Sequence, residues 1–204
     1  MSKMAFVYPG QGVQNPGMGA DFYKESKEAE QIYNEAESIL DFDIKKVCFE
    51  ENDLINNTEY TQAALVTTYL AITGEVIKRE IFPDVTAGLS LGEYGAICVA
   101  GGMNEKEAIS LVRKRGIYMN NAVPEGFGGM TAVLGLNKED IDNVLREKDG
   151  VSVANYNCPG QIVISGSIEG INKACEQMKA AGAKRALPLK VGGAFHSPLM
   201  NPAK

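Results

Sequence analysis

The sequence predicts an α/β fold with two parts: a hydrolase-like large subdomain built on a parallel sheet, and a small subdomain inserted into it. The first observation is a Gly-x-Ser-x-Gly pattern around Ser90, between a β-prone run and a helix-like run, as in a nucleophile elbow. The second is the element order β-α-β-β-α-β after the glycines at 126–129, which is that of a ferredoxin-like split unit. The third is a change of pattern after Gly192-Gly193.

Composition and charge narrow the class of protein. The 204 residues are 45% hydrophobic and 23% charged, which is ordinary for a globular chain. A net charge of −6 argues against nucleic acid as a partner, because phosphate binding needs a basic face. The sequence has no apolar stretch long enough for a signal peptide or a membrane span, and its four cysteines are too widely spaced for a metal site. We therefore expect a metal-free, cytoplasmic protein with no membrane partner. We also expect a monomer, which the composition itself does not indicate.

The large subdomain is expected to begin with a strand at residues 5–8, which stops at Pro9. The following Gly10-Gln11-Gly12 is half of a dinucleotide-binding fingerprint, but Asn15 occupies the place of the third glycine. A Rossmann site is therefore not expected. The loop instead offers backbone N–H groups to an anionic group.

Apolar residues at helical spacing predict three long helices in this subdomain. They cover residues 20–40, 58–80 and 104–122, and the second is apolar on most sides, so we expect it at the centre. The third begins with Asn104 and Glu107, which resemble a capping box.

One cation falls on the apolar face of the third helix. Arg115 continues its apolar stripe, whereas Arg113 and Lys114 fall off the stripe and are expected in solvent. A buried guanidinium needs a partner, either an internal carboxylate or the carboxylate of a substrate held by its planar fork. The apolar members of the stripe are Ala108, Leu111, Val112 and Met119.

The small subdomain is expected over residues 126–191, between a large-subdomain segment at 1–125 and a return to that subdomain at 192–204. Its predicted elements are a strand at 130–136, a helix at 138–148, strands at 151–155 and 161–165, a helix at 168–181 and a strand at 184–189.

His196 is the only histidine of the chain. A lone histidine is more often a surface or core residue than a functional one, but a serine nucleophile needs a general base. If the chain carries a Ser–His pair, its members are Ser90, or another serine, and His196.

Four separated stretches resemble, together and in this order, the malonyl-CoA:acyl carrier protein transacylase family. They are Phe6-Val7-Tyr8-Pro9-Gly10-Gln11-Gly12, the elbow around Ser90, Arg115-Gly116 and Phe195-His196-Ser197, and the loop Asn155–Gln161 is also similar to one in that family. The resemblance covers the whole chain. It implies an α/β large subdomain that continues beyond this chain's last residue, with an inserted ferredoxin-like unit.

The resemblance implies an acyl-enzyme reaction. Ser90 would attack the thioester of malonyl-CoA while His196 takes its proton, and the backbone N–H groups of Gln11 and Leu91 would form the oxyanion hole. The malonyl group would then pass to the phosphopantetheine thiol of acyl carrier protein, in fatty acid or polyketide synthesis. No cofactor beyond these reactants is implied.

The resemblance also implies a substrate site. Arg115 would pair with the malonyl carboxylate, Gln62 would line the same site, and Phe195 would crowd an α-methyl branch and so disfavour methylmalonyl. The sequence departs from the family at Leu89, where the family often has histidine.

Two other functions stay open. One is a serine hydrolase or thioesterase of the patatin kind that uses Ser90, which would have no use for a cation such as Arg115 beside the acyl group. The other is an inactive, truncated fragment that only docks acyl carrier protein, for which Lys184, Arg185 and Lys190 form a candidate basic patch.

Overall fold

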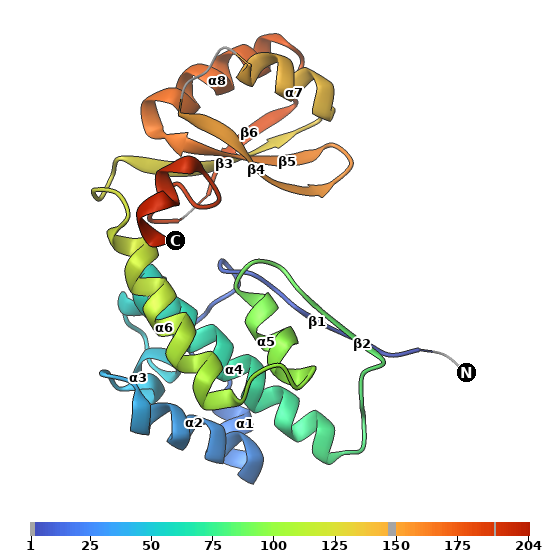
Figure 1. The fold of residues 1–204 in the computed structure, drawn as a ribbon, viewed down its shortest axis with the longest axis vertical. Coiled ribbons are helices and arrows are strands. Elements are labelled where there is room, and N and C mark those ends of the chain that lie inside the picture. Colours follow the sequence, from blue (N-terminus) through green and yellow to red (C-terminus); the bar gives the residue numbers. More distant parts are fainter. Residues whose placement is uncertain (1–2, 147–149, 190) are drawn as a thin grey trace. The chain divides into compact units, whose positions relative to one another are not determined.

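A computed structural model describes residues 3–146, 150–189 and 191–204 of the protein. The chain divides into two compact units, Met1–Ile117 and Tyr118–Lys204 (Figure 1). The fold is mixed α/β, with a parallel sheet in the first unit and an antiparallel sheet in the second.

The parallel sheet of the first unit has strands β1 (Ala5–Tyr8) and β2 (Val85–Gly88), in register from Ala5 opposite Val85 to Tyr8 opposite Gly88. Helix α5 (Gly92–Val99) packs on both strands. The side chains of Val7 and Val85 are 71% and 56% exposed. Parallel sheets are ordinarily covered on both faces, so these valines mark an uncovered face in this unit.

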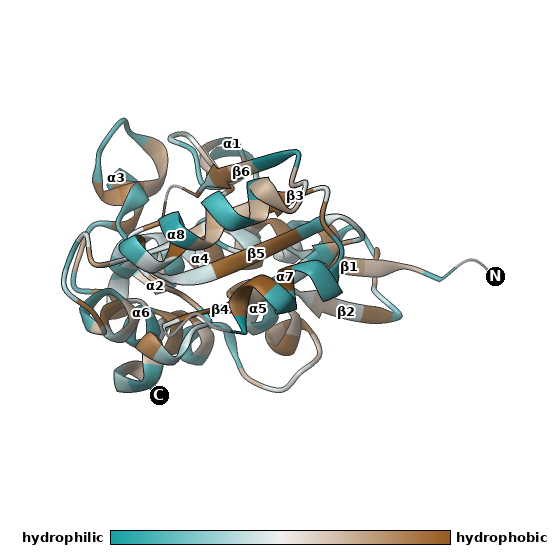
Figure 2. Ribbon diagram, turned by 90° about the horizontal axis from the view of Figure 1, so that it is seen from above, coloured by the Kyte–Doolittle hydropathy of each residue, from teal (hydrophilic) through white to brown (hydrophobic). Residues whose placement is uncertain are grey.

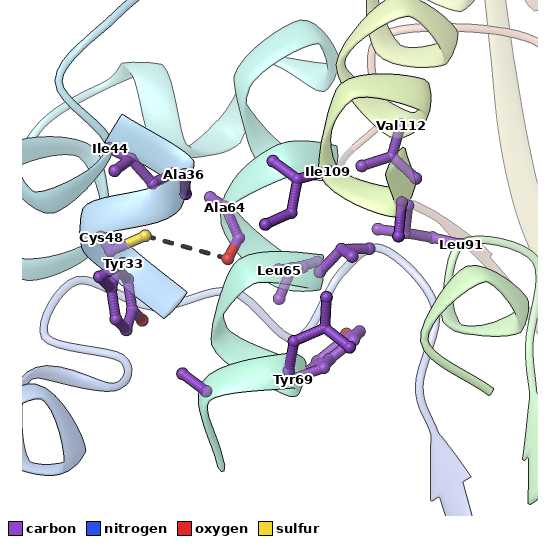
Figure 3. Close-up of a cluster of buried hydrophobic side chains, with 14 of the residues drawn as sticks. Tyr33, Ala36, Ile44, Cys48, Ala64, Leu65, Tyr69, Leu91, Ile109 and Val112 are labelled. Carbon is purple, nitrogen blue, oxygen red and sulfur yellow. Dashed lines mark hydrogen bonds between the residues drawn. The ribbon is translucent and has the colours of Figure 1, made fainter. Parts of the chain in front are cut away.

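Helix α4 (Thr58–Lys78) is central to the first unit, as its composition predicted, and most of its residues are buried. Figure 3 shows Ala64, Leu65 and Tyr69 of α4 within the main cluster of buried apolar side chains. The elements that accompany it are α1 (Ala20–Glu25), α2 (Lys27–Ile39), α3 (Ile44–Phe49), the 3-10 turn η1 (Leu54–Asn56) and α6 (Glu105–Asn121), whose last turn belongs to the second unit.

The predicted single helix over 20–40 is wrong, because the structure has two helices there, α1 and α2. Ser26 has an extended backbone, and its hydroxyl accepts a hydrogen bond from the Ala29 amide at 3.2 Å. A serine in this place is an N-cap, which ends the first helix and begins the second. The capping box at Asn104 is confirmed, with reciprocal bonds of 2.9 Å to Glu107.

The second unit contains, in order, β3 (Gly128–Leu134), α7 (Lys138–Leu145), β4 (Val151–Cys158), β5 (Gln161–Ser167), α8 (Ile168–Ala180), β6 (Arg185–Pro188) and the 3-10 turn η2 (Pro198–Ala203). Its strands form an antiparallel sheet in the order β4-β5-β3-β6. Both helices lie on one face of this sheet in Figure 1, and β5 is hydrophobic for most of its length in Figure 2. The predicted positions Lys148 and Lys190 lie outside the described residues.

Two further observations concern the part of the chain that the structure describes. None of its helices combines the length and apolarity that a bilayer crossing requires. No three of its His, Cys, Asp and Glu side chains gather in a way that could hold a metal ion.

Candidate active site

Ser90 stands on a sharp turn between β2 and α5. Its φ of 52° is in the left-handed region, which a non-glycine residue adopts at a local cost. A Cβ on Gly88 would overlap the backbone of Gly92, and a Cβ on Gly92 would overlap the carbonyl of Tyr8 in β1. The two glycines of the pattern are therefore required by the close packing of strand and helix on either side of Ser90.

Replacement of Gly92 by alanine should destabilise the first unit. The nearest atoms to the added Cβ are backbone atoms of Tyr8 and Pro9, so we expect a loss of about 3 kcal/mol in the free energy of unfolding. Gly74→Ala is the matched control, because a Cβ there meets only ordinary contact inside α4 and alanine favours helix. Chemical denaturation measures both, and equal stability of Gly92→Ala and the wild type would contradict the steric account.

Arg115 of α6 reaches the turn. Its Nη2 donates a hydrogen bond of 3.0 Å to Ser90 Oγ, and its Nη1 donates one of 2.6 Å to Gln62 Oε1. The guanidinium carbon lies 5.5 Å from the centre of the Tyr94 ring. Gln62 is only 1% exposed, in the second turn of α4. The structure thus brings three predicted site residues together in one unit.

Arg115 makes no ion pair within 4.0 Å among the described residues. Burial lowers the pKa of its guanidinium, against the smaller opposing effects of Tyr94 and Glu93. Such a site favours an anion from outside the chain.

The loop after β1 packs beside the elbow. A Cβ on Gly10 would lie 3.1 Å from the carbonyl oxygen of Leu89, and the Gln11 side chain donates a hydrogen bond of 3.1 Å to Thr58 Oγ1 of α4. Leu91, which directly follows Ser90, is buried and occupies the N-cap position of α5. Gln11 and Leu91 therefore belong to the two backbone segments that flank Ser90.

His196 belongs to the second unit, and its φ of 56° is also in the left-handed region. The hydroxyl of the next residue, Ser197, donates a hydrogen bond to the Ala194 carbonyl at 2.7 Å and accepts one from the Leu199 amide at 3.3 Å. These two bonds hold the backbone turn that contains His196. Phe195 is buried in a cluster with Met130 of β3. The pairing of Ser90 with His196 stays a prediction.

Loss of the Ser197 hydroxyl should impair the turn that carries His196. We expect Ser197→Ala to slow acylation of Ser90 by about tenfold, because misplaced catalytic groups lose rate steeply. Ser197→Thr keeps the hydroxyl and should retain the rate. Ser167→Ala is the matched control, because it removes the N-cap of α8 in the same unit. Equal acylation rates in Ser197→Ala and Ser167→Ala would argue against a role for this turn.

The helical periodicity of α6 predicted the wrong exposure for two residues. Leu111, predicted on the apolar stripe, is 44% exposed, and Ile109 is buried in its place. Arg113, predicted in solvent, has a side chain only 11% exposed. Its Nε and Nη2 donate to the two carboxylate oxygens of Asp41 at 2.8 and 2.9 Å. No local pattern signals this pair, because its members are far apart in the sequence.

Known proteins resemble the whole of this chain. A family described as "Acyl transferase domain" matches residues 5–204. The malonyl CoA-acyl carrier protein transacylase of Bacillus subtilis (strain 168) is 46% identical over 208 residues, which is 100% of this chain and 66% of that relative. The transacylase of the same name from Staphylococcus aureus (strain MRSA252) is 42% identical over 205 residues, 98% of this chain and 66% of that one.

Solved structures of transacylases also match this chain. The crystal structure of malonyl CoA-acyl carrier protein transacylase from Clostridium perfringens has a TM-score of 0.94 at 40% identity, covering 99% of this chain and 65% of that chain. A structure of a type II PKS acyl-carrier protein in complex with its malonyl-transacylase has a TM-score of 0.94 at 42% identity. The match covers 99% of this chain and 67% of that chain. The chain thus spans about two thirds of the length of the relatives it matches. It belongs to the acyl transferase domain family.

Proposed function

We propose that the chain provides the nucleophile and acyl-binding groups of an enzyme that transfers a malonyl group from malonyl-CoA to the phosphopantetheine thiol of acyl carrier protein. The observation that carries the proposal is the hydrogen bond from Arg115 to Ser90 Oγ, made by a guanidinium whose pKa partial burial lowers. A malonyl group bears its free carboxylate one carbon from the carbonyl that a serine attacks. A cation in hydrogen-bond reach of the nucleophile suits that acyl group.

In the first half-reaction, Ser90 Oγ attacks the thioester carbonyl of malonyl-CoA and His196 takes the hydroxyl proton. The backbone N–H groups of Gln11 and Leu91 stabilise the oxyanion of the tetrahedral intermediate. When the carbon–sulfur bond breaks, coenzyme A leaves as a thiol with the proton that His196 held, and the malonyl group remains as an ester on Ser90. The left-handed turn at Ser90 and the loop beside it support these roles.

In the second half-reaction, the phosphopantetheine thiol of the carrier protein attacks the ester. His196 takes the thiol proton and returns it to Ser90 Oγ as the ester bond breaks. The proposal needs no cofactor besides the reactants. The relative solved in complex with its acyl-carrier protein supports the choice of partner.

Selectivity for malonyl would come from three side chains. Arg115 pairs with the carboxylate, and Gln62, bonded to Nη1, holds the guanidinium in place. Phe195 disfavours an α-methyl branch by about 1–3 kcal/mol, the usual worth of one methyl group in a pocket. Gly193 supports a crowded site, since a Cβ there would lie 2.8 Å from the Phe195 ring.

The fold and setting are part of the proposal. The large subdomain (1–125, with 192–204) is hydrolase-like, and the small one (126–191) is ferredoxin-like, which the strand order β4-β5-β3-β6 supports. The protein acts as a cytoplasmic monomer in fatty acid or polyketide synthesis, and the relative solved with a type II PKS acyl-carrier protein supports the polyketide alternative.

The test is covalent labelling of Ser90 by malonyl-CoA, followed by release of the label to holo acyl carrier protein. Intact-mass spectrometry reads both steps. A label that forms and leaves only with water would indicate a hydrolase instead. Binding of the carrier protein without any label would indicate a docking fragment.

A further inference from the structure

The first two turns of α4 are contacted by two residues of the candidate site and by Arg113, which lies outside it. Thr58 Oγ1 accepts a hydrogen bond from Gln11, and Gln62 Oε1 accepts one from Arg115. Between them, the backbone carbonyl of Glu59 accepts a bond of 2.6 Å from Nη1 of Arg113. The start of this helix therefore connects the loop after β1 with two arginines of α6.

Helices α4 and α6 touch at this point without intervening side chains. A Cβ on Gly116 would lie 2.8 Å from the Thr58 carbonyl oxygen and 3.0 Å from the Glu59 Cα. Backbones this close leave little room for one helix to move towards the other. Sliding or rotation of α6 remains possible unless side chains prevent it.

Arg113 is the side chain placed to prevent such motion. It donates hydrogen bonds to the Glu59 carbonyl and to both carboxylate oxygens of Asp41. Its guanidinium carbon lies 5.0 Å from the centre of the Phe42 ring and 4.9 Å from that of the Tyr60 ring. The hydrogen bond from Arg113 holds the pKa of Asp41 below its usual range. Fork bonding and ring stacking together define one position for the planar group.

The two arginines hold α4 from different sides. Residues two apart on a helix point about 200° apart, so Arg113 and Arg115 leave α6 in nearly opposite directions. One bonds the first turn of α4 through Glu59 and the other bonds Gln62. A shift of α6 that released Arg113 would also carry Arg115 away from Ser90 Oγ.

We propose that Arg113 is a positioning residue, which fixes α6 on the start of α4 and so sets the place of the Arg115 guanidinium beside Ser90. The consequence is selectivity for a carboxylate-bearing acyl group, and in this the inference rests on the proposed function. Arg113 does not touch the acyl group itself. A misplacement of a binding group by about 1 Å can lower the rate by about 10²-fold. Loss of Arg113 should therefore have a measurable effect through the position of the Arg115 guanidinium.

The experiment compares Arg113→Ala with Arg79→Ala in the 204-residue chain. Arg79 is the matched control, since it also bonds a carboxylate, Glu75, at 2.7 Å, but lies 72% exposed at the end of α4. The first readout is the rate at which malonyl-CoA and acetyl-CoA each label Ser90, by intact mass. The second is the pair of Nη resonances of Arg115 in ¹⁵N-arginine spectra, assigned with Arg115→Lys.

In Arg113→Ala we expect malonyl labelling to fall by about 10- to 100-fold and acetyl labelling by less than about threefold. The two Nη signals, which are separate while bonds hold the guanidinium still, should merge. Arg79→Ala should leave both readouts as in the wild type. If Arg113→Ala does not fold, Asp41→Asn takes its place, because it keeps the shape and weakens only the bonds from Arg113.

Equal losses for both acyl groups, or unchanged Nη signals, would overturn the positioning role. A wild-type chain that takes no malonyl label would instead count against the proposed function. The Nη signals still decide the role of Arg113 in that case, since they require no turnover.

Discussion

Brief exposure to malonyl-CoA should add one malonyl group to the wild-type chain and none to Ser90→Ala. Ser90 is the residue that the glycine-flanked turn presents, and its hydroxyl accepts a hydrogen bond from Arg115. Alanine removes the attacking oxygen and leaves the binding cation in place, so binding without labelling is expected. Intact-mass spectrometry reads the result directly.

Ser38→Ala is the control for this experiment. Ser38 is exposed, and its hydroxyl donates to the Glu35 carbonyl in α2, so its loss should leave labelling unchanged. A label that persists in Ser90→Ala would move the nucleophile to another residue. A folded wild-type chain that stays unlabelled would count against the proposed function.

Arg115→Ala should lose malonyl labelling by about 10²- to 10³-fold, while acetyl labelling changes little or rises. Truncation of one member of a buried charge pair costs about 2–5 kcal/mol, and here the other member is the malonyl carboxylate. The stability of the first unit should not fall in parallel, because the variant also removes a cation whose pKa burial lowers. Rates from both acyl-CoA substrates and a denaturation curve test the two halves of this prediction.

Lys114→Ala is the matched control for Arg115→Ala. Lys114 is the exposed neighbour of Arg115 on α6. Its replacement by alanine removes one positive charge from the same helix and leaves the site residues unchanged. Arg115→Lys keeps the charge but not the planar fork and should be intermediate. An unchanged preference for malonyl in Arg115→Ala would exclude the guanidinium as the carboxylate ligand.

The parts of the fold that local chemistry dictates could be predicted from the sequence. The strand at Ala5–Tyr8, the turn at Ser90 and the capping box at Asn104 each depend on residues a few positions apart. The inward direction of Arg115 followed from helical spacing, although only the structure shows that it bonds Gln62 and Ser90 Oγ.

Long-range partners could not be predicted in this way. Arg113 falls off the apolar stripe of α6, yet Asp41, 72 positions earlier, and the rings of Phe42 and Tyr60 make a buried place for it. The break at Ser26 was missed for a related reason. Serine is tolerated within helices as well as favoured at their starts, so the apolar stripe alone did not show that two helices meet there.

The division into two compact units bears on what the stability of this protein means. Each unit has hydrophobic clusters of its own. The first unit has one around α4, and the second has others that include side chains of the antiparallel sheet. Cooperative all-or-none unfolding is a property of single domains, and a chain with two cores can lose them in separate steps. A melting temperature then averages two equilibria. Ser90 and His196 belong to different units, so the local structure around each of them can be lost in a separate step.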